Sequence, residues 1–213
     1  MSKQKELVRL EEKLKNDAGL PLRESNLVFG EGSVDSPVMF IGEAPGLRED
    51  QLRRPFVGQS GKLLDKLIES VGWKRGDVYI TNIVKRRPPG NRDPLPEEIE
   101  AYAPCLKRQI EIINPKIIAT LGRFSMNYFA PAAKITRDQG KVFRLENKRL
   151  LVPLFHPAAA LRSTANLEAL AKSFKKLPVA LEKYEELVNN ASAAKEESKN
   201  FSEERRQLQE KLF

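Results

Sequence analysis

Four segments of the chain contain residues whose types could do chemistry on a bound ligand. Glu43 and Glu49 lie in a glycine-rich stretch over 42–61, Asn82 ends an apolar run, and His156 is the single histidine of the chain. Carboxylates and imidazole can hold or move protons, and an amide offers a hydrogen-bond donor beside an acceptor. Taken singly, Asn82 is an ordinary turn residue and His156 a cap or packing residue. Their weight as a site therefore depends on whether the fold brings them together.

Cations are concentrated in one of these segments. The stretch over 81–92 contains Lys85, Arg86, Arg87 and Arg92, and Arg162 follows the histidine. The whole chain carries 37 Lys and Arg against 29 Asp and Glu, a formal net charge of +8. Such a field favours a polyanionic partner, and nucleic acid is the leading candidate. Because 31% charged residues is also compatible with an ordinary soluble surface, charge alone does not settle the partner.

The elements that must position these residues form an α/β pattern. Short apolar runs at regular intervals predict buried parallel strands over Val38–Ala44, Val78–Val84, Ile117–Leu121 and Leu150–Phe155. Apolar residues at three and four spacing predict crossover helices over Gly61–Val71 and Pro96–Ile113. We expect a three-layer sandwich with a central four-stranded parallel sheet flanked by helices. The chemistry-bearing segments all follow strands, so they should meet at the carboxyl edge of this sheet.

The two ends of the chain differ in composition from its middle. Residues 1–15 are charged at helical spacing, and no apolar run approaches membrane length, so we expect no signal peptide and no membrane contact. One cysteine, Cys105, cannot form an internal disulfide, which fits a reducing, cytoplasmic location. We predict one domain over residues 1–181 and a charged, helical or partly disordered extension over 182–213. A soluble monomer is expected.

Four motifs in order and spacing resemble the uracil-DNA glycosylase superfamily, and most closely its family 4. The resemblance runs from about Leu27 to Leu177. It is carried by Gly42-Glu43-Ala44-Pro45-Gly46 with Glu49-Asp50, Pro55-Phe56-Val57-Gly58-Gln59-Ser60-Gly61, Asn82 within 81–92, and His156-Pro157-Ala158-Ala159 with Arg162. The resemblance implies an enzyme of base excision repair that flips uracil out of DNA and hydrolyses its N-glycosidic bond. It also implies a uracil-DNA glycosylase-like fold.

The roles implied for single residues follow the chemistry of uracil excision. Phe56 would stack on the flipped base, and the Asn82 amide would donate to uracil O4 and accept from N3–H. His156 would donate to O2, where negative charge develops as uracil departs, from either a neutral or a cationic ring. The base pocket would be completed by Gly42, Ala44 and Ser60.

Handling of the attacking water is expected to fall on a glutamate. The fastest branch of the superfamily has an aspartate where this chain has Ala44, so Glu43 and Glu49 are the candidates to orient water or to stabilise the cationic sugar. Glu49 could also wall off a 5-methyl group and so refuse thymine. The alternative for either glutamate is support of the loop backbone.

The cations are expected to hold phosphates on both sides of the flipped nucleotide, whether the DNA is single- or double-stranded. Leu161 or Arg162 would fill the gap left in the base stack. The residues predicted to bind DNA are Lys85, Arg86, Arg87, Arg92, Leu161 and Arg162.

The resemblance breaks at the cofactor. Family 4 enzymes usually hold a 4Fe–4S cluster on four cysteines, of which this chain keeps the last, Cys105, whereas Arg86 stands at the loop cysteine. We therefore predict no iron-sulfur cluster and no metal. Two other functions stay open from the sequence: a non-catalytic DNA-binding relative, whose pocket should be broken, and a glycosylase for a broader set of deaminated bases.

Overall fold

A six-stranded sheet forms the middle layer of the protein. The computed structural model describes residues 1–145 and 147–188, and its strand order is β1-β3-β2-β4-β6-β5. The four inner strands run parallel and are buried throughout: β2 (Val38–Gly42), β3 (Tyr79–Asn82), β4 (Ile117–Leu121) and β6 (Leu150–Leu154). They coincide with the four predicted apolar runs, which confirms the predicted parallel core of the sheet.

The sheet is wider than the four strands expected from the sequence. β1 (Glu31–Gly32) pairs antiparallel with β3 at one edge, and β5 (Phe143–Arg144) pairs antiparallel with β6 at the other. Each edge strand has two residues, which is too short to produce an alternating apolar pattern in the sequence. The predicted count of four strands was therefore wrong by these two edges.

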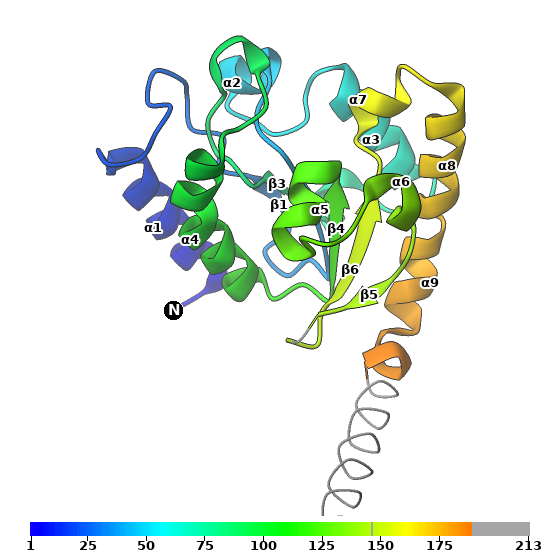
Figure 1. Cartoon of the computed structure of the whole chain (residues 1–213). Helices are drawn as coiled ribbons and strands as arrows, with labels where there is room; N and C mark the ends of the chain where they lie inside the picture. Colours follow the sequence, from blue (N-terminus) through cyan, green and yellow to red (C-terminus); the bar gives the residue numbers. More distant parts are fainter. Residues whose placement is uncertain (146, 189–213) are drawn as a thin grey trace, which may run out of the picture.

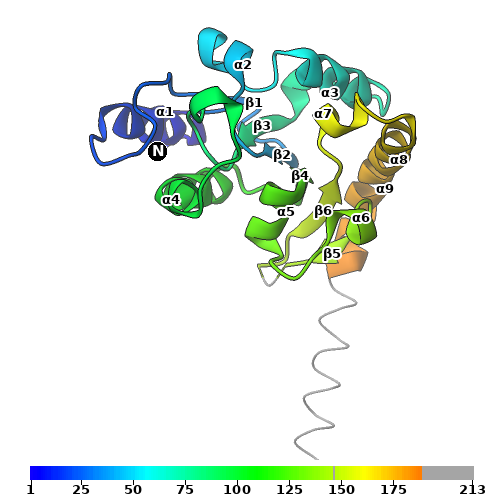
Figure 2. The ribbon, with the colours of Figure 1, turned by 45° about the horizontal axis from the view of Figure 1, so that its top comes forward.

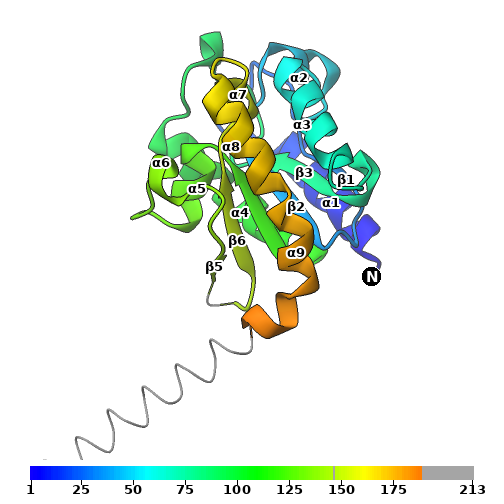
Figure 3. The same cartoon turned by 90° about the vertical axis from the view of Figure 1, so that its right-hand side faces the viewer.

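Helices cover both faces of the sheet, as the three-layer prediction requires (Figures 1 and 3). Alternate residues of each strand point to opposite faces, so Phe40 stacks on Phe174 at 5.5 Å while Ile41 packs in the cluster on the other side. One face carries α1 (Lys3–Asn16), α4 (Pro96–Ile113) and α5 (Arg123–Phe129). The opposite face carries α3 (Gln59–Glu69), α7 (Pro157–Ala160), α8 (Thr164–Phe174) and α9 (Lys176–Glu182).

The longest helix in the described part of the chain, α4, shows how the sequence sets such an element. Pro96 occupies the first turn, and the Glu98 carboxylate accepts from the Leu95 backbone N–H at 2.8 Å, which satisfies one of the donors left open at a helix start. A stripe of buried side chains faces the sheet, and the helix ends where Asn114 adopts a left-handed conformation. The predicted bounds of this helix are confirmed.

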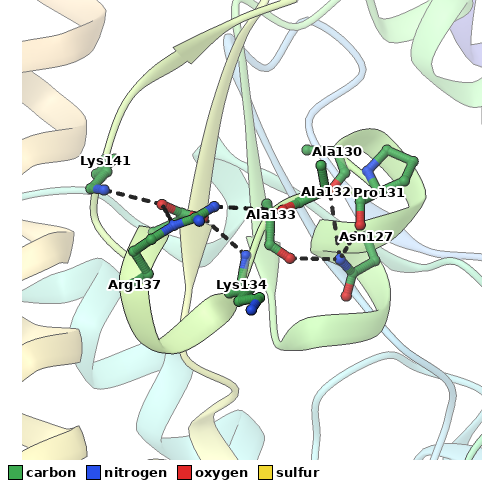
Figure 4. A network of polar contacts seen from close by, with 9 residues as sticks. Asn127, Ala130, Pro131, Ala132, Ala133, Lys134, Arg137 and Lys141 are labelled. Carbon is green, nitrogen blue, oxygen red and sulfur yellow. Dashed lines mark hydrogen bonds and ion pairs between the residues drawn. The ribbon is translucent and has the colours of Figure 1, made fainter.

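A polar network holds the connection between α5 and the edge strand β5 (Figure 4). The buried Asp138 carboxylate, at the end of α6 (Ile135–Asp138), accepts from the Lys134 backbone N–H at 2.9 Å and pairs with Arg137 at 2.6 Å and Lys141 at 3.0 Å. Hydrogen bonds from Arg137 hold the pKa of this carboxyl well below its usual range. Asn127 donates to the carbonyl of Ala133 at 2.9 Å and closes the turn before it.

Short elements and loops gather at the carboxyl ends of the parallel strands. α2 (Leu47–Leu52) follows β2, the turn η2 (Pro89–Asn91) follows β3, and α7 follows β6. Figure 2 shows α2, α3 and α7 at this end of the molecule. A further turn, η1 (Arg75–Asp77), precedes β3. The loops that carry the candidate site residues therefore surround one edge of the sheet.

Residues 183–188 continue past α9 along the domain, where the Tyr184 hydroxyl donates to the Lys148 carbonyl at 2.8 Å. The predicted extension over 182–213 lies mostly outside the described residues, so the domain boundary stays a prediction. In the described part of the chain, none of the helices combines the length and the apolar character needed to cross a membrane.

Candidate active site

A pocket of about 510 Å³ opens at the carboxyl ends of β2, β3 and β6. It brings together most of the residues selected from the sequence, although they lie far apart in the chain. Predicted residues that line it are Glu43, Ala44, Glu49, Phe56, Ser60, Asn82, Arg92, His156 and Arg162. The lining also includes residues that were not predicted: Pro45, Gly46, Gly58, Gln59, Pro88, Asn91, Asp93 and Ala158.

Gly42 lies beneath the pocket and allows Phe56 and Asn82 to meet. Gly42 pairs with Asn82 across the parallel strands β2 and β3. A Cβ atom at this position would lie 2.4 Å from Asn82 Oδ1 and 2.5 Å from Phe56 Cζ, so any other residue would displace one or both of these side chains. Glycine is therefore needed to keep the aromatic ring and the carboxamide in these positions, because both approach the backbone closely.

The Asn82 carboxamide is buried and keeps a free acceptor. The residue is 1% exposed, and its Oδ1 atom has no hydrogen-bond partner within the described chain. A buried polar atom without a partner costs free energy, and native proteins satisfy the great majority of such atoms. A ligand with an N–H group on a flat edge would satisfy it.

The Phe56 loop is fixed on both sides of the aromatic residue. Phe56 itself adopts a left-handed backbone conformation, with φ +50°, which a bulky residue takes only when its surroundings impose it. Glu49 Oε1 accepts from the backbone N–H groups of Val57 at 2.9 Å and Gly58 at 2.8 Å. Arg75 donates to the Pro55 carbonyl at 2.6 Å. This geometry supports the loop-holding alternative for Glu49.

His156 faces Phe56 across the pocket, with ring centroids 5.8 Å apart and planes tilted by 36°. Its Nδ1 atom accepts from the Ala158 backbone N–H at 3.1 Å. A nitrogen that accepts carries no proton, which assigns the proton of a neutral ring to Nε2. Burial lowers the pKa of His156 to about 4. At neutral pH this pKa makes the ring an uncharged hydrogen-bond donor, the neutral one of the two states that the sequence left open.

The Glu43 carboxyl group has a pKa close to neutral pH. Burial first, and then the nearby negative charge of Asp93, raise its pKa to about 7, against the opposing effect of Arg123. Arg123 also pairs with Asp93 at 2.5 Å. Asp93 was missed in the sequence, where the loop over 81–92 drew attention only for its cations. The signal that could have found it is a carboxylate one residue beyond that loop.

Two of the predicted DNA contacts were wrong. Lys85 has no exposed surface, and its Nζ atom donates to Thr81 Oγ1, the Asn82 carbonyl and Gln109 Oε1. Arg86 is 6% exposed and donates to the Ser25 carbonyl. Side chains engaged inside the protein cannot reach a phosphate. In the sequence both looked like members of a basic loop, because a run of cations normally lies at the surface.

The other predicted DNA contacts lie at or near the surface. Arg162 lines the pocket and is exposed, and Leu161 beside it is 52% exposed. Arg92 pairs with Glu98 at 2.5 Å, and Arg87 donates to Asn91 Oδ1 at 2.6 Å. The pocket rim can thus still present cations and an apolar side chain to a polymer that enters it.

The residues present do not fit a four-cysteine cluster. The chain has one cysteine, Cys105, which is buried on α4, and Arg86 fills the neighbouring loop position. On the same side, the Tyr102 hydroxyl donates to the Pro21 carbonyl at 2.7 Å. Over residues 1–145 and 147–188, no group of three or more His, Cys, Asp or Glu side chains is placed to hold a metal ion.

Comparison with known proteins agrees with this geometry. Residues 29–182 match the family model described as the uracil DNA glycosylase superfamily. The chain is 48% identical over 162 residues to a protein of Sulfurisphaera tokodaii named type-4 uracil-DNA glycosylase, covering 72% of this chain and 74% of the relative. A protein of the same name from Thermotoga maritima is 44% identical over 149 residues, covering 69% and 78%. A third, from Saccharolobus solfataricus, is 48% identical over 165 residues, covering 73% and 76%. The chain belongs to the uracil DNA glycosylase superfamily.

Proposed function

We propose that this chain is a uracil-DNA glycosylase, which flips uracil out of DNA, hydrolyses the N-glycosidic bond and leaves an abasic site for base excision repair. The observation that carries the proposal is the buried Asn82 carboxamide, whose Oδ1 atom has no partner in the described chain, beside Phe56 and the neutral His156 in one pocket. Relatives 42–48% identical named type-4 uracil-DNA glycosylase support it. A non-catalytic relative should have lost this pocket, so its intact geometry favours an enzyme.

Recognition rests on the two groups that meet over Gly42. The flipped base stacks on Phe56, and Asn82 Oδ1 accepts from uracil N3–H while its amide donates to O4. Cytosine offers an acceptor at N3 and a donor at its amine, so it would leave both amide atoms of Asn82 buried and unpaired. Ala44 and Ser60 complete the lining.

Bond cleavage rests on His156. As the glycosidic bond breaks, the electron pair moves to uracil N1 and negative charge spreads to O2, while the sugar becomes oxocarbenium-like. The Nε2–H of the neutral ring donates to O2, and this hydrogen bond strengthens as the charge develops. The Ala158 N–H at Nδ1 holds the tautomer that allows it.

We assign the attacking water to Glu43 rather than to Glu49. Glu49 Oε1 already accepts hydrogen bonds from two backbone N–H groups, whereas the Glu43 carboxylate accepts none in the described chain. With Ala44 in place of an acid, Glu43 is the carboxyl group whose pKa allows it to accept a proton from water near pH 7. The proton passes to Glu43 as hydroxide adds to C1′.

DNA is held outside the pocket by Arg162, Arg92 and Arg87, with Leu161 as the side chain that fills the vacated stack. The chain is proposed to work as a monomer without an iron-sulfur cluster. Its location in the cytoplasm stays a prediction.

The assignment of Glu43 predicts a pH dependence. A carboxyl with a pKa of about 7 is protonated below that pH and cannot act as a base, so the single-turnover rate of uracil release should fall about tenfold for each pH unit below 7. Titration of His156 should not change the rate in this pH range, because a pKa of about 4 leaves the ring neutral from about pH 5 upward. Rates measured between pH 5.5 and 8.5 check this.

Two variants test the assignment of this pH dependence to Glu43. Glu43→Gln should release uracil slowly, at a rate that does not change with pH over the same range. Asp93→Asn should shift the fall in rate to lower pH, because removal of the neighbouring negative charge lowers the pKa of Glu43. A parental profile that stays flat through pH 7, together with a fast Glu43→Gln variant, would remove Glu43 from the mechanism.

The products and cofactor requirement give the direct test of the proposal. On an end-labelled oligonucleotide with one uracil, the purified protein should leave an intact backbone that alkali then cleaves at the uracil position. We expect the same rate in EDTA, and no stoichiometric iron or visible absorption in the same anaerobic preparation. A strict need for a divalent ion, or bound iron with cluster absorption, would contradict this part of the proposal.

A further inference from the structure

The buried ammonium group of Lys85 lies directly behind the residue that reads the base. Its Nζ atom is 2.6 Å from Thr81 Oγ1, 2.7 Å from the Asn82 carbonyl oxygen and 2.5 Å from Gln109 Oε1. The residue has no exposed surface, although lysine is almost never fully buried. In the part of the chain that the structure describes, no carboxylate forms an ion pair with it.

All three partners require a donor. The Thr81 hydroxyl gives its own proton to the Phe29 carbonyl at 2.8 Å, so its oxygen can only accept from Lys85. Gln109 Nε2 donates to the same carbonyl at 2.9 Å, which turns Oε1 toward the ammonium. An ammonium has three N–H donors and no acceptor, and here each donor finds one oxygen. Burial lowers the pKa of Lys85 to about 8, so this cation persists at pH 7.

The Asn82 carbonyl needs this donor because the sheet ends beside it. On one side of Asn82, β3 continues along β2, where the Ile83 N–H donates to the Gly42 carbonyl at 3.0 Å. On the other side, β1 pairs with Tyr79 and Ile80 and then stops. Beyond β1 the chain still passes along this side, where the Val28 N–H donates to the Lys85 carbonyl and the Phe29 carbonyl accepts from Thr81. Among the described residues, however, no backbone N–H on that side donates to the Asn82 carbonyl, and the lysine does so instead.

Removing an ammonium from water is costly, and this cost is offset because its three N–H groups satisfy three buried oxygen atoms. What the ammonium also provides is a fixed position for the Asn82 main chain, from which the carboxamide with its unpaired Oδ1 atom projects beside Phe56. The test below therefore separates a contribution to folding from a contribution to recognition.

We propose that Lys85 is a positioning residue for uracil recognition, which acts by clamping the Asn82 carbonyl at the open edge of β3. This inference rests on the proposed function, since it assigns Asn82 to the base. It predicts that loss of the clamp harms recognition of uracil more than it harms folding.

The test compares Lys85→Met, which keeps the length of the side chain without its donors, with a matched control. Gln109→Met removes another oxygen partner of the same ammonium but leaves the bond to the Asn82 carbonyl. For Lys85→Met we expect the inhibition constant of free uracil to rise about tenfold or more, and the ratio of uracil to cytosine excision to fall by a similar factor. For Gln109→Met we expect both values within about twofold of the parent, even where its melting temperature falls.

A double-mutant cycle separates positioning from general damage. In an Asn82→Ala background, Lys85→Met should change the rate of uracil excision by less than about twofold, because the group that it positions is already gone. Lys85→Gln, which retains an amide donor, should lie between parent and Lys85→Met, and it serves in its place if Lys85→Met does not fold.

The outcomes are distinct. If the parental protein releases no uracil from DNA, the proposed function fails. If the parent is active but the Lys85 variant keeps the parental inhibition constant, or loses as much rate with Asn82→Ala as without it, the clamp is overturned while the proposed function stands.

Discussion

Replacing His156 by alanine is expected to slow uracil release by roughly 10²–10³-fold, which corresponds to about 3–4 kcal/mol of transition-state stabilisation. The ring is neutral, with its proton on Nε2, and its hydrogen bond is worth most when charge sits on uracil O2. Binding of uracil-containing DNA should stay nearly unchanged, because the ground-state carbonyl attracts the donor weakly. Single-turnover release under saturating enzyme, with DNA binding measured separately, checks both parts.

The matched control for this variant is His156→Asn. Asparagine is a favoured cap at the position before a helix, so it can accept the Ala158 N–H that His156 Nδ1 accepts. Its amide is too short to replace the Nε2 donor. We therefore expect His156→Asn to be as slow as His156→Ala. A parental rate in His156→Asn would show that the histidine acts as a helix cap, and a parental rate in His156→Ala would leave the anion to backbone amides.

Replacing Asn82 by aspartate is expected to give the second large effect, on specificity. A protonated carboxyl can donate to cytosine N3 and an ionised one can accept from the cytosine amine, whereas the amide of the parent matches neither group. We expect the ratio of uracil to cytosine excision rates to fall by at least about 10²-fold, since sites built on buried hydrogen bonds discriminate by larger factors than this. Paired oligonucleotides that differ at one base provide the measurement.

Asn82→Ala is the control, because it removes the donor and the acceptor without offering new ones. It should lose uracil excision and gain no activity on cytosine. If Asn82→Asp kept the parental ratio, the carboxamide would not be the group that distinguishes the bases, and its missing partner would need another explanation.

The sequence predicted the structure correctly where one sequence pattern is typical of one kind of element. The runs Ile117–Leu121 and Leu150–Phe155 are short and mostly apolar, as is typical of a strand buried on both faces, and the structure has them as β4 and β6 with a difference of one residue. Because parallel strands share a carboxyl edge, Asn82 and His156 could be expected to meet, and they line the same pocket.

The sequence did not predict a residue's role where that role depends on the residue's surroundings in the folded protein. Lys85 and Arg86 stand in a run of cations, but the β3 edge left open by the two-residue strand β1 turns Lys85 inward. No local pattern predicts that edge. In the same way, the position of the proton on His156 depends on one backbone N–H, and the raised pKa of Glu43 depends on burial and on the nearby Asp93. The sequence alone predicts neither this hydrogen bond nor the burial of Glu43.

The most direct test of the central claim is the identity of the base that the protein sets free. The parental protein is incubated in EDTA with two oligonucleotides that differ only by uracil or cytosine at one position, and the released base is identified by mass. We predict about one equivalent of free uracil from the first DNA and no detectable cytosine from the second. Binding of both DNAs without release of uracil would contradict the claim that this pocket is a uracil-excision site.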